Sequence, residues 1–583
     1  MRTTGDASRT SAAAPGPRIL FVSPCGPYPK VPPERDPLDF FYYRNTLGQG
    51  PFRLRSFQSW YSLHFLAQNL PVPSVVLENP TLKGFQREVD GGGYSAVAMG
   101  FTVITTGRIL AMAEWLKAAH PDVDVILGGY GTAVFRDPDE TARRLRALAD
   151  HVCDGEGVAF MQEYLARRWG IRHTMPLRQD FIPMRHCFYR TSLPYFSQLV
   201  VVGALGCTYG CSFCATSSQF GRRRIPIASG RTLFGLLLQQ ARAHPRAQSA
   251  IVYDEDFLMN RERALEFMHC MEWSEELRAR PMLLTVFASV RSVRQYTMAE
   301  LVRGGIGTIY IGVESFDEEV LGRESLGKRQ GDVAALFEEL HRHGICTLGS
   351  LIVGWDGQSR DMMLRESARF VALNPTFYQV VPLHPAPGTA LWDRLKREGR
   401  LLADYSFARD SIARFTFELK DATREEALGV VERTYADLVA EGGPWPFRLY
   451  ANLLRGAANL AGDADPAMRA RAATCRRMMA PLLPLAMLSR VFFSGRGFRS
   501  RWAAAMRDTL RRFPLLFLAG CAGALVALPL LAALYAAAAA RNRLLPYGDQ
   551  PPVIRREYGN AAENQVHAVA PASRVRTGRI AAA

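Results

Sequence analysis

The chain has 583 residues, enough for two to four domains, and its 48% hydrophobic and 22% charged content excludes a disordered protein. Ten cysteines scattered over this length do not form a disulfide framework, which indicates a reducing compartment. The net charge of +16 does not indicate nucleic-acid binding, because eleven arginines against a single Asp508 fall between Met468 and Phe513, directly before an uncharged apolar run.

The N-terminal part predicts a doubly wound α/β domain over residues 18–175. Residues 1–17 are rich in Ser, Thr, Ala and Pro and predict a disordered tail, with no secretory signal before the first strand. Helices are expected near 57–70 and 107–119. The expected strands are 18–24, 74–77, 94–102, 123–129 and 151–157. Strands that alternate with helices in this way indicate a parallel sheet covered on both faces.

Two of these expected strands end on glycines. Gly128 and Gly129 end one of them, and Gly155 with Glu156 ends the next. Ligands bind at the carboxyl ends of such strands, where glycine lets the backbone approach closely, so these four residues are candidates for cofactor binding.

After a linker over 176–195, residues 196–400 continue the alternation of strands and helices. The six expected strands are 198–205, 249–254, 283–288, 308–314, 346–354 and 377–382. This pattern predicts a second α/β unit with a parallel sheet.

Three cysteines, Cys207, Cys211 and Cys214, form a C-x3-C-x2-C triplet on the loop that leaves the first of these strands. A [4Fe–4S] cluster normally takes four thiolates, so three thiolates leave one iron open to an outside ligand. A zinc site is the alternative, although it would require a fourth Cys or His at C-x2-C spacing, and none lies nearby.

The triplet, with Phe213 just before its last cysteine, resembles the signature of the radical S-adenosylmethionine (SAM) enzymes. Together, residues 196–400 and the upstream domain over 18–175 resemble the cobalamin-binding, class B methyltransferase-like members of that family. In that family SAM chelates the open iron, and one electron from the cluster releases a 5′-deoxyadenosyl radical. The resemblance implies that 196–400 form a partial (β/α)6 barrel and that 18–175 form a cobalamin-binding-like, Rossmann-like domain.

The resemblance also implies which residues contact SAM at the ends of the barrel strands. Asp254, Glu255 and Asp256 would bind the ammonium group of SAM. Ser289 and Arg291 follow the third strand, and Arg291 would face the SAM carboxylate. Glu314 and Ser315 would contact the ribose and carboxylate, and Ile352 and Gly354 would lie against the adenine. A solvated acidic loop remains the alternative for residues 254–256. Arg222–Arg224, beyond the triplet, would either grip an acidic or phosphate-bearing substrate or form a solvated face.

The N-terminal domain departs from the usual cobalamin domain in one respect. It lacks the Asp-x-His-x-x-Gly run whose histidine binds cobalt from below, and the loop over 24–29 has neither Asp nor His. Cobalamin-dependent radical SAM methylases commonly lack that histidine, and a free lower face suits methyl transfer to a carbon radical. The alternative is a domain that has lost its ligand.

The C-terminal part predicts helices and a membrane contact. A helical cap is expected over 401–465, a basic amphipathic segment over 466–512 with 478–493 flat on the membrane, and a tail over 541–583. Residues 513–540 carry no charge and exceed the roughly 20 residues needed to cross a bilayer. Pro529 also permits a re-entrant helix, and a buried Ala-rich helix is the alternative. The basic upstream flank places the catalytic part at the cytoplasmic face.

The sequence therefore predicts a membrane-anchored radical SAM enzyme with a [4Fe–4S] cluster, SAM and cobalamin, which methylates an unactivated carbon of a small hydrophobic, lipid- or isoprenoid-like substrate. A low-potential flavodoxin- or ferredoxin-like protein would supply electrons, and no nucleic acid is expected. The alternatives are radical cyclisation, coupling or rearrangement without methyl transfer, and a membrane-tethered iron–sulfur redox or sensor module.

Overall fold

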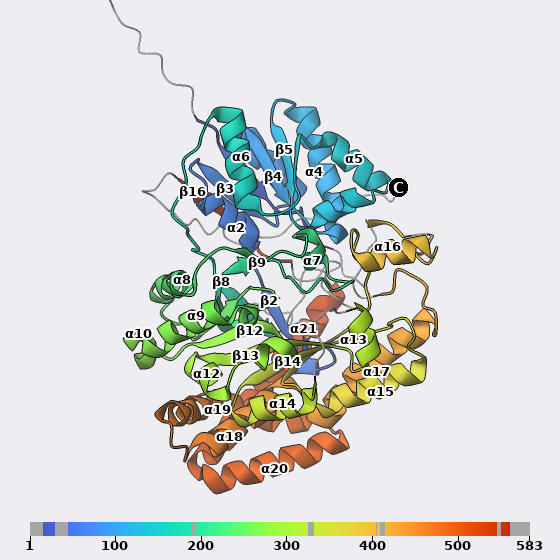
Figure 1. The fold of residues 1–583 in the computed structure, drawn as a ribbon. Coiled ribbons are helices and arrows are strands. Elements are labelled where there is room, and N and C mark those ends of the chain that lie inside the picture. Colours follow the sequence, from blue (N-terminus) through green and yellow to red (C-terminus); the bar gives the residue numbers. More distant parts are fainter. Residues whose placement is uncertain are drawn as a thin grey trace, which may run out of the picture.

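The computed structural model describes residues 16–28, 45–188, 194–324, 331–403, 405–407, 414–544 and 550–559. These residues form two α/β units, one above the other, and a layer of helices lies against the far end of the second unit (Figure 1).

The upper unit is a sheet with strand order β16-β3-β1-β4-β5-β6. Its parallel strands are β1 (Ile19–Val22), β3 (Ser74–Glu78), β4 (Ala96–Gly100), β5 (Asp124–Gly128) and β6 (His151–Cys153). Helices α2 (Tyr61–Gln68) and α6 (Gly157–Trp169) pack on one face. Helices α3 (Leu82–Gly92), α4 (Thr106–Ala119) and α5 (Glu140–Leu148) pack on the other, so each expected strand is present in a doubly wound unit.

The edge of this sheet comes from the C-terminal end of the chain. Strand β16 (Ile554–Tyr558), inside the expected tail, pairs antiparallel with β3. The Tyr558 hydroxyl lies 2.6 Å from Nδ1 of the buried His64, and Arg556 forms an ion pair with Asp180. The sequence does not reveal this strand, because its run Ile-Arg-Arg-Glu-Tyr is mostly charged and one of its two buried side chains is Arg556.

The lower unit has strand order β15-β14-β13-β12-β11-β8-β7-β2. Its six parallel strands match the expected ones and are β8 (Pro194–Val201), β11 (Ser249–Val252), β12 (Leu283–Ser289), β13 (Ile306–Glu314), β14 (Cys346–Val353) and β15 (Phe377–Pro382). Two antiparallel strands, β7 (Met184–Phe188) and β2 (Leu54–Phe57), extend this half-barrel. The expected linker thus contains a strand, and a segment of the expected first domain joins the second sheet.

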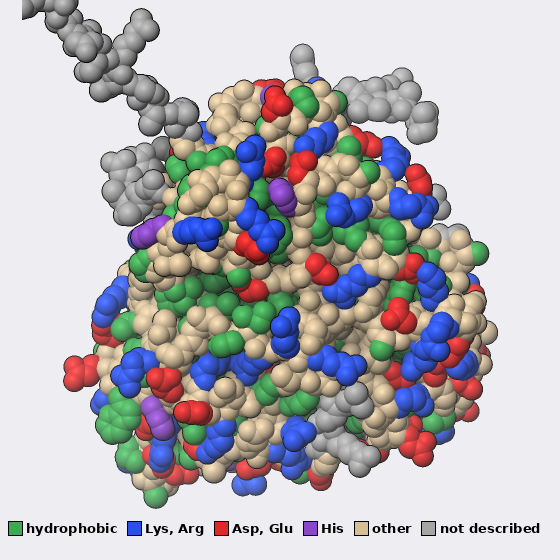
Figure 2. Space-filling model, turned by 45° about the horizontal axis from the view of Figure 1, so that its top comes forward, with side chains coloured by type: hydrophobic (Ala, Val, Ile, Leu, Met, Phe, Trp, Pro, Cys, Tyr) green, Lys and Arg blue, Asp and Glu red, His purple; other side chains and the backbone are tan. Residues whose placement is uncertain are grey.

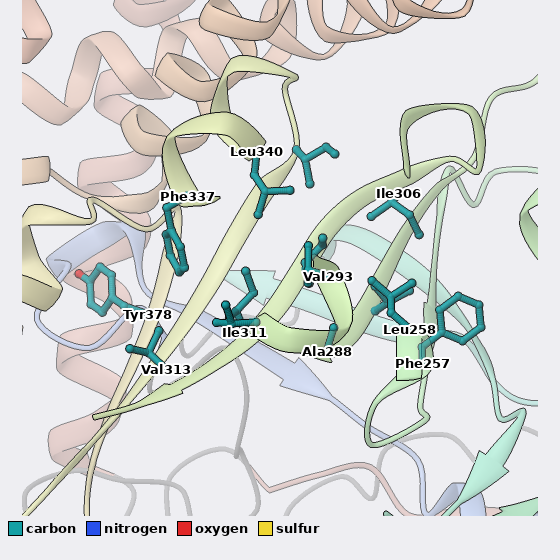
Figure 3. Close-up of a cluster of buried hydrophobic side chains, with 14 of the residues drawn as sticks. Phe257, Leu258, Ala288, Val293, Ile306, Ile311, Val313, Phe337, Leu340 and Tyr378 are labelled. Carbon is teal, nitrogen blue, oxygen red and sulfur yellow. The ribbon is translucent and has the colours of Figure 1, made fainter. Parts of the chain in front are cut away.

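Helices cover the outer face of the half-barrel (Figure 1). They include α8 (Gly230–Ala243), α9 (Arg261–Trp273), α12 (Met298–Arg303), α14 (Val333–Arg342) and α15 (Arg360–Ala372). Figure 3 shows the core between them and the sheet, where Ile311 and Val313 of β13 and Phe337 of α14 are fully buried or nearly so. This packed layer keeps the strand ends in fixed positions.

Between residues 424 and 544 the chain is helical, with α17 (Arg424–Gly442), α18 (Trp445–Leu460), α19 (Pro466–Phe492), α20 (Arg496–Arg512) and α21 (Pro514–Leu544). The apolar side chains of α19, including Met479 and Leu483, are buried in the same cluster as those of α18. Most apolar side chains of segment 478–493 thus pack within the protein, while Val491 is exposed, and the membrane contact of this segment stays a prediction.

Helix α21 is long and apolar enough over Pro514–Ala537 to cross a membrane, and only 11% of its most apolar window is buried. One face packs closely on α19, because a Cβ at Gly520 would lie 2.5 Å from Leu483 Cδ2. The other face exposes Leu515, Leu525 and Val526 by 75% or more. Residues 514–537 therefore do not form the buried Ala-rich helix that was the alternative interpretation of this run.

Candidate functional site

A cavity of about 910 Å³ lies where the carboxyl ends of the two sheets meet. Its upper wall includes residues at the ends of β4, β5 and β6, and its lower wall includes residues at the ends of β11, β12 and β13. Figure 2 shows apolar side chains gathered across the middle of one face of the molecule, between the upper and lower parts.

The cysteines Cys207, Cys211 and Cys214 all line this cavity. They lie on the loop between β9 (Ala204–Leu205) and α7 (Ala215–Gln219), and β9 pairs with β10 (Ile225–Pro226) to close the loop into one unit. Within the described ranges, no three Cys, His, Asp or Glu side chains converge so that they could hold a single metal ion. A cubane cluster distributes its thiolates over separate irons, so the donor set of three cysteines in one wall fits it.

Glu324, at the end of α13 (Glu318–Glu324), anchors the cysteine loop. Its backbone carbonyl accepts a 2.8 Å hydrogen bond from the Ser212 N–H, and its carboxylate accepts one from the Ser212 hydroxyl. Arg323 and Arg394 form ion pairs with the same carboxylate at 2.8 and 2.9 Å. Burial alone would raise the pKa of Glu324, but these hydrogen bonds and charges outweigh it and hold the pKa below its usual value. No motif in the sequence pointed to this residue.

Asp254, the first of the three acids after β11, uses both of its carboxylate oxygens in contacts with other residues of the protein. Its Oδ1 accepts hydrogen bonds from the backbone N–H groups of Gly203 at 2.7 Å and Ala204 at 2.9 Å. Its Oδ2 forms ion pairs with Arg224, at 3.1 Å, and Arg263. This carboxylate therefore ties β11 to the start of the cysteine loop.

The other two acids differ from each other. Asp256 accepts hydrogen bonds from the Ser289 N–H at 3.0 Å and the Ser292 hydroxyl at 2.7 Å. Glu255 lines the cavity, and its buried Oε2 has no hydrogen-bond partner among the described residues. Burial raises the pKa of Glu255, chiefly by desolvation. Asp254 is paired through both of its oxygens, whereas Glu255 presents an unpaired acceptor at the cavity, and the run is not a solvated loop.

The structure brings only some of the remaining SAM candidates to the cavity. Phe213, Ser289 and Glu314 line it. The other four candidates lie outside the cavity wall. Arg291 is exposed on α11 (Val290–Val293), and Ser315 is buried and donates a hydrogen bond to Glu366. Ile352 belongs to the barrel core, and Gly354 lies against the Phe415 ring.

The glycines of the upper wall form a cradle. Gly129 has a φ of 89°, and a Cβ there would lie 2.9 Å from the Phe101 carbonyl oxygen. Gly155 has a φ of 145° and would place a Cβ in open space, while Gly128 also lines the cavity. Glu156 lines it too, but its carboxylate caps α6 by accepting two backbone hydrogen bonds at 2.7 Å. Because these strand ends carry glycines rather than side chains, a large, flat cofactor could lie close to the backbone here.

A row of aromatic rings that sequence reasoning missed forms the floor of the cavity. Tyr253, Phe287 and Tyr310 lie on or just after three adjacent strands, with ring centroids 5.9 and 5.1 Å apart, and Tyr61 from α2 lies 5.9 Å from Tyr253. Each looks like an ordinary strand residue in the sequence. The signal that could have revealed them is an aromatic residue in register on successive strands.

Hydrogen bonds connect the two walls beside the cysteines. The segment η3 (Tyr130–Arg136), which follows Gly129, donates from Arg136 Nη1 to Ser218 Oγ of α7 at 2.8 Å. Gln219 of α7 donates to Asp154 at 2.7 Å, just after β6. The helix that follows Cys214 is thereby attached to the glycine cradle.

Comparisons with known proteins agree with this geometry. Residues 201–370 match the family model of the radical SAM superfamily. The chain is 23% identical over 354 residues to an uncharacterized methyltransferase of Pyrococcus horikoshii, covering 58% of this chain and 71% of that protein. It is 26% identical over 209 residues to the hopanoid C-2 methylase of Rhodopseudomonas palustris, covering 34% of this chain and only 38% of the methylase.

The fold is similar to that of TsrM, a radical SAM methyltransferase from Kitasatospora setae solved with cobalamin and a [4Fe–4S] cluster bound. The TM-score is 0.50 at 14% identity, and the match covers 79% of this chain and 98% of TsrM. Residues 201–370 thus carry the radical SAM domain, and the fold is similar to that of a radical SAM methyltransferase solved with cobalamin bound.

The Glu324 anchor predicts that Glu324→Gln lowers cluster content after anaerobic reconstitution. The substitution removes a hydrogen-bonded charge worth about 1.5–3 kcal/mol from the base of the cysteine loop. Iron and labile sulfide per chain measure the effect. Glu318→Gln, an exposed position on the same helix, is the matched control. Full cluster content in the Glu324 variant would contradict the anchoring role.

Proposed function

We propose that this enzyme methylates an unactivated carbon of a hydrophobic substrate in a cobalamin-dependent radical SAM reaction. The observation that carries the proposal is the shared cavity, in which three cysteines of the lower unit face a glycine cradle of the upper unit. When bound, the cluster with SAM supplies a 5′-deoxyadenosyl radical, and cobalamin supplies the methyl group.

The residues of the lower wall would hold the cluster and SAM. Cys207, Cys211 and Cys214 would bind three irons, and Phe213 packs edge-on against Trp355 at 5.2 Å, which steadies the loop. Glu255 would accept a charge-assisted hydrogen bond from the SAM ammonium group through its free Oε2.

The upper wall would hold cobalamin through backbone contact. Gly128, Gly129 and Gly155 would let the cofactor approach the strand ends, and their neighbour Glu156 would keep α6 in place. The hydrogen bonds from Arg136 and Gln219 would keep this wall at a constant distance from the cysteines.

The aromatic floor supports an apolar substrate. Rings from Tyr253, Phe287 and Tyr310 would cover a hydrocarbon and exclude water from the radical. Similarity to a hopanoid methylase agrees with a lipid- or isoprenoid-like molecule.

Cobalamin binding tests the proposal directly. The reconstituted chain, offered hydroxocobalamin and desalted, is expected to retain about one equivalent, with no nitrogen ligand below cobalt in its visible spectrum. Reduced enzyme should form 5′-deoxyadenosine and a product heavier by one methylene, and Cys211→Ala should abolish both. Retention of the cluster without cobalamin would instead support radical rearrangement or coupling.

The two acids Glu255 and Asp254 should respond differently to neutralisation. Glu255→Gln is expected to weaken SAM binding about tenfold without loss of stability, because it removes one charge-assisted contact. Asp254→Asn should instead destabilise the fold by about 3–5 kcal/mol, since it leaves Arg263 buried without its partner.

Calorimetric SAM titration and urea unfolding separate these outcomes. Because burial raises the pKa of Glu255, SAM affinity of the unaltered enzyme should fall as the pH is lowered through that raised pKa, and Glu255→Gln should remove this dependence. Equal SAM affinity in both proteins would exclude Glu255 as a ligand.

We infer that α21 attaches the enzyme to a membrane without crossing it. Its exposed face is apolar, and the preceding turn of α20 exposes Arg511 and Arg512, a combination suited to an anionic surface. Both neighbours of α21 pack on one folded body, α20 against the helical layer and β16 against the upper sheet. A helix that crossed the bilayer would separate them.

Sedimentation with vesicles containing phosphatidylglycerol tests this attachment. Replacing Leu525 and Val526 together by Ser should reduce binding, because it removes two large apolar side chains from the exposed face of α21. Leu483→Ala, in the buried contact that α19 makes with α21, should not reduce it. In proteoliposomes, a cysteine introduced at the exposed position Val553 should react with a membrane-impermeant thiol reagent on the same side as the catalytic domain. Reaction from the opposite side alone would mean that α21 spans.

A further inference from the structure

Arg222 and Arg223 lie in the same compact unit as the cysteines. They occupy the turn between α7 and β10, where the Arg222 N–H donates to the Ser217 carbonyl at 2.8 Å and the Arg223 N–H donates to the Phe220 carbonyl at 3.1 Å. Both residues are exposed. Their position relative to the cysteine loop is therefore set by backbone hydrogen bonds and by the β9–β10 pairing.

The turn lies directly against the cysteine loop. A Cβ on Gly210, between Cys207 and Cys211, would lie 2.9 Å from Arg222 Nε and 3.3 Å from its Cζ. A Cβ on Gly206 would lie 2.2 Å from the Arg223 carbonyl oxygen. The cysteine loop thus has its cavity on one side and this exposed turn on another.

Arg222 and Arg223 differ in their ion pairing from the other arginines near the cysteine loop. Arg224 is paired with Asp254, Arg136 with Asp154, and Arg394 with Glu324. No carboxylate of the described residues forms an ion pair with Arg222 or Arg223. Two exposed, uncompensated cations create a local positive potential that attracts an acidic protein surface.

We propose that Arg222 and Arg223 form the docking surface for an acidic one-electron donor protein. This inference rests on the proposed function, because the donor's role is to reduce the cluster. One electron passes from the reduced flavin or iron–sulfur centre of the donor to the oxidised cluster, and the donor is oxidised by one electron. Docking on this turn brings the donor to the cysteine loop while SAM and substrate occupy the cavity.

A small phosphate-bearing substrate fits this turn less well than a protein surface. Both arginines are exposed, and the described contacts of the turn are backbone hydrogen bonds rather than an enclosing polar pocket. Protein docking needs only complementary charge on an open face.

The test compares the Arg222→Glu/Arg223→Glu double variant with the unaltered full chain. Binding of a purified acidic flavodoxin is measured by calorimetry at low and high salt, and cluster reduction is followed by visible absorption with flavodoxin or with dithionite. The double variant should bind flavodoxin roughly tenfold more weakly at low salt, with a smaller difference at high salt. Its reduction by flavodoxin should slow, and its reduction by dithionite should not.

The matched control is Arg476→Glu/Arg477→Glu, an adjacent exposed pair on α19 with the same change in net charge. Unchanged flavodoxin binding in the Arg222/Arg223 variant, or an equal loss in the control, would overturn the proposal. Absence of 5′-deoxyadenosine from the unaltered enzyme with dithionite would instead count against the proposed function, and the binding measurement would still decide the docking surface.

Discussion

The carboxyl ends of two parallel sheets face each other across one cavity, and the features of the site depend on this opposition. Strand ends carry the loops of α/β proteins, so the arrangement places the cysteine loop of one unit opposite the glycine cradle of the other. The hydrogen bonds from Arg136 to Ser218 and from Gln219 to Asp154 hold the two walls together beside Cys214.

The buried carboxylates around this cavity have two different roles, one structural and one in ligand binding. Asp254 and Glu324 are surrounded by N–H groups and guanidinium groups, so they stabilise the two ends of the cysteine unit. Glu255, between Asp254 and Asp256, keeps an unpaired oxygen at the cavity. An unpaired buried acceptor costs free energy, and a cationic ligand would remove that cost.

Three surfaces of the molecule suit three different partners. The aromatic floor suits an apolar substrate, the exposed arginine turn suits an acidic donor, and the apolar face of α21 suits a lipid surface. They lie on different elements, so the proposed donor, substrate and membrane need not compete for the same residues.

Much of the architecture could be predicted from local sequence. The five parallel strands of the upper unit and the six parallel strands of the lower one follow from short apolar runs between helices. Cys207, Cys211 and Cys214 lie, as expected, on the loop after a strand, and they line the cavity. Strands β2 and β16 were not predicted, because their partners β7 and β3 lie far away along the chain. Strand β7 pairs with the neighbouring β8, yet its run Met-Arg-His-Cys-Phe is too polar to stand out from a linker.

The sequence by itself determined the three thiolates, the glycines at the strand ends and the long uncharged helix, since each is a property of consecutive residues. Only the tertiary structure decided that Asp254 is paired within the protein while Glu255 Oε2 is unpaired at the cavity. It also decided that Ser315 and Gly354 lie outside the cavity wall, and that the segment after α21 returns to the first sheet. Each of these depends on contacts between residues far apart in the chain, because burial and pairing are set by neighbours that the local sequence does not name.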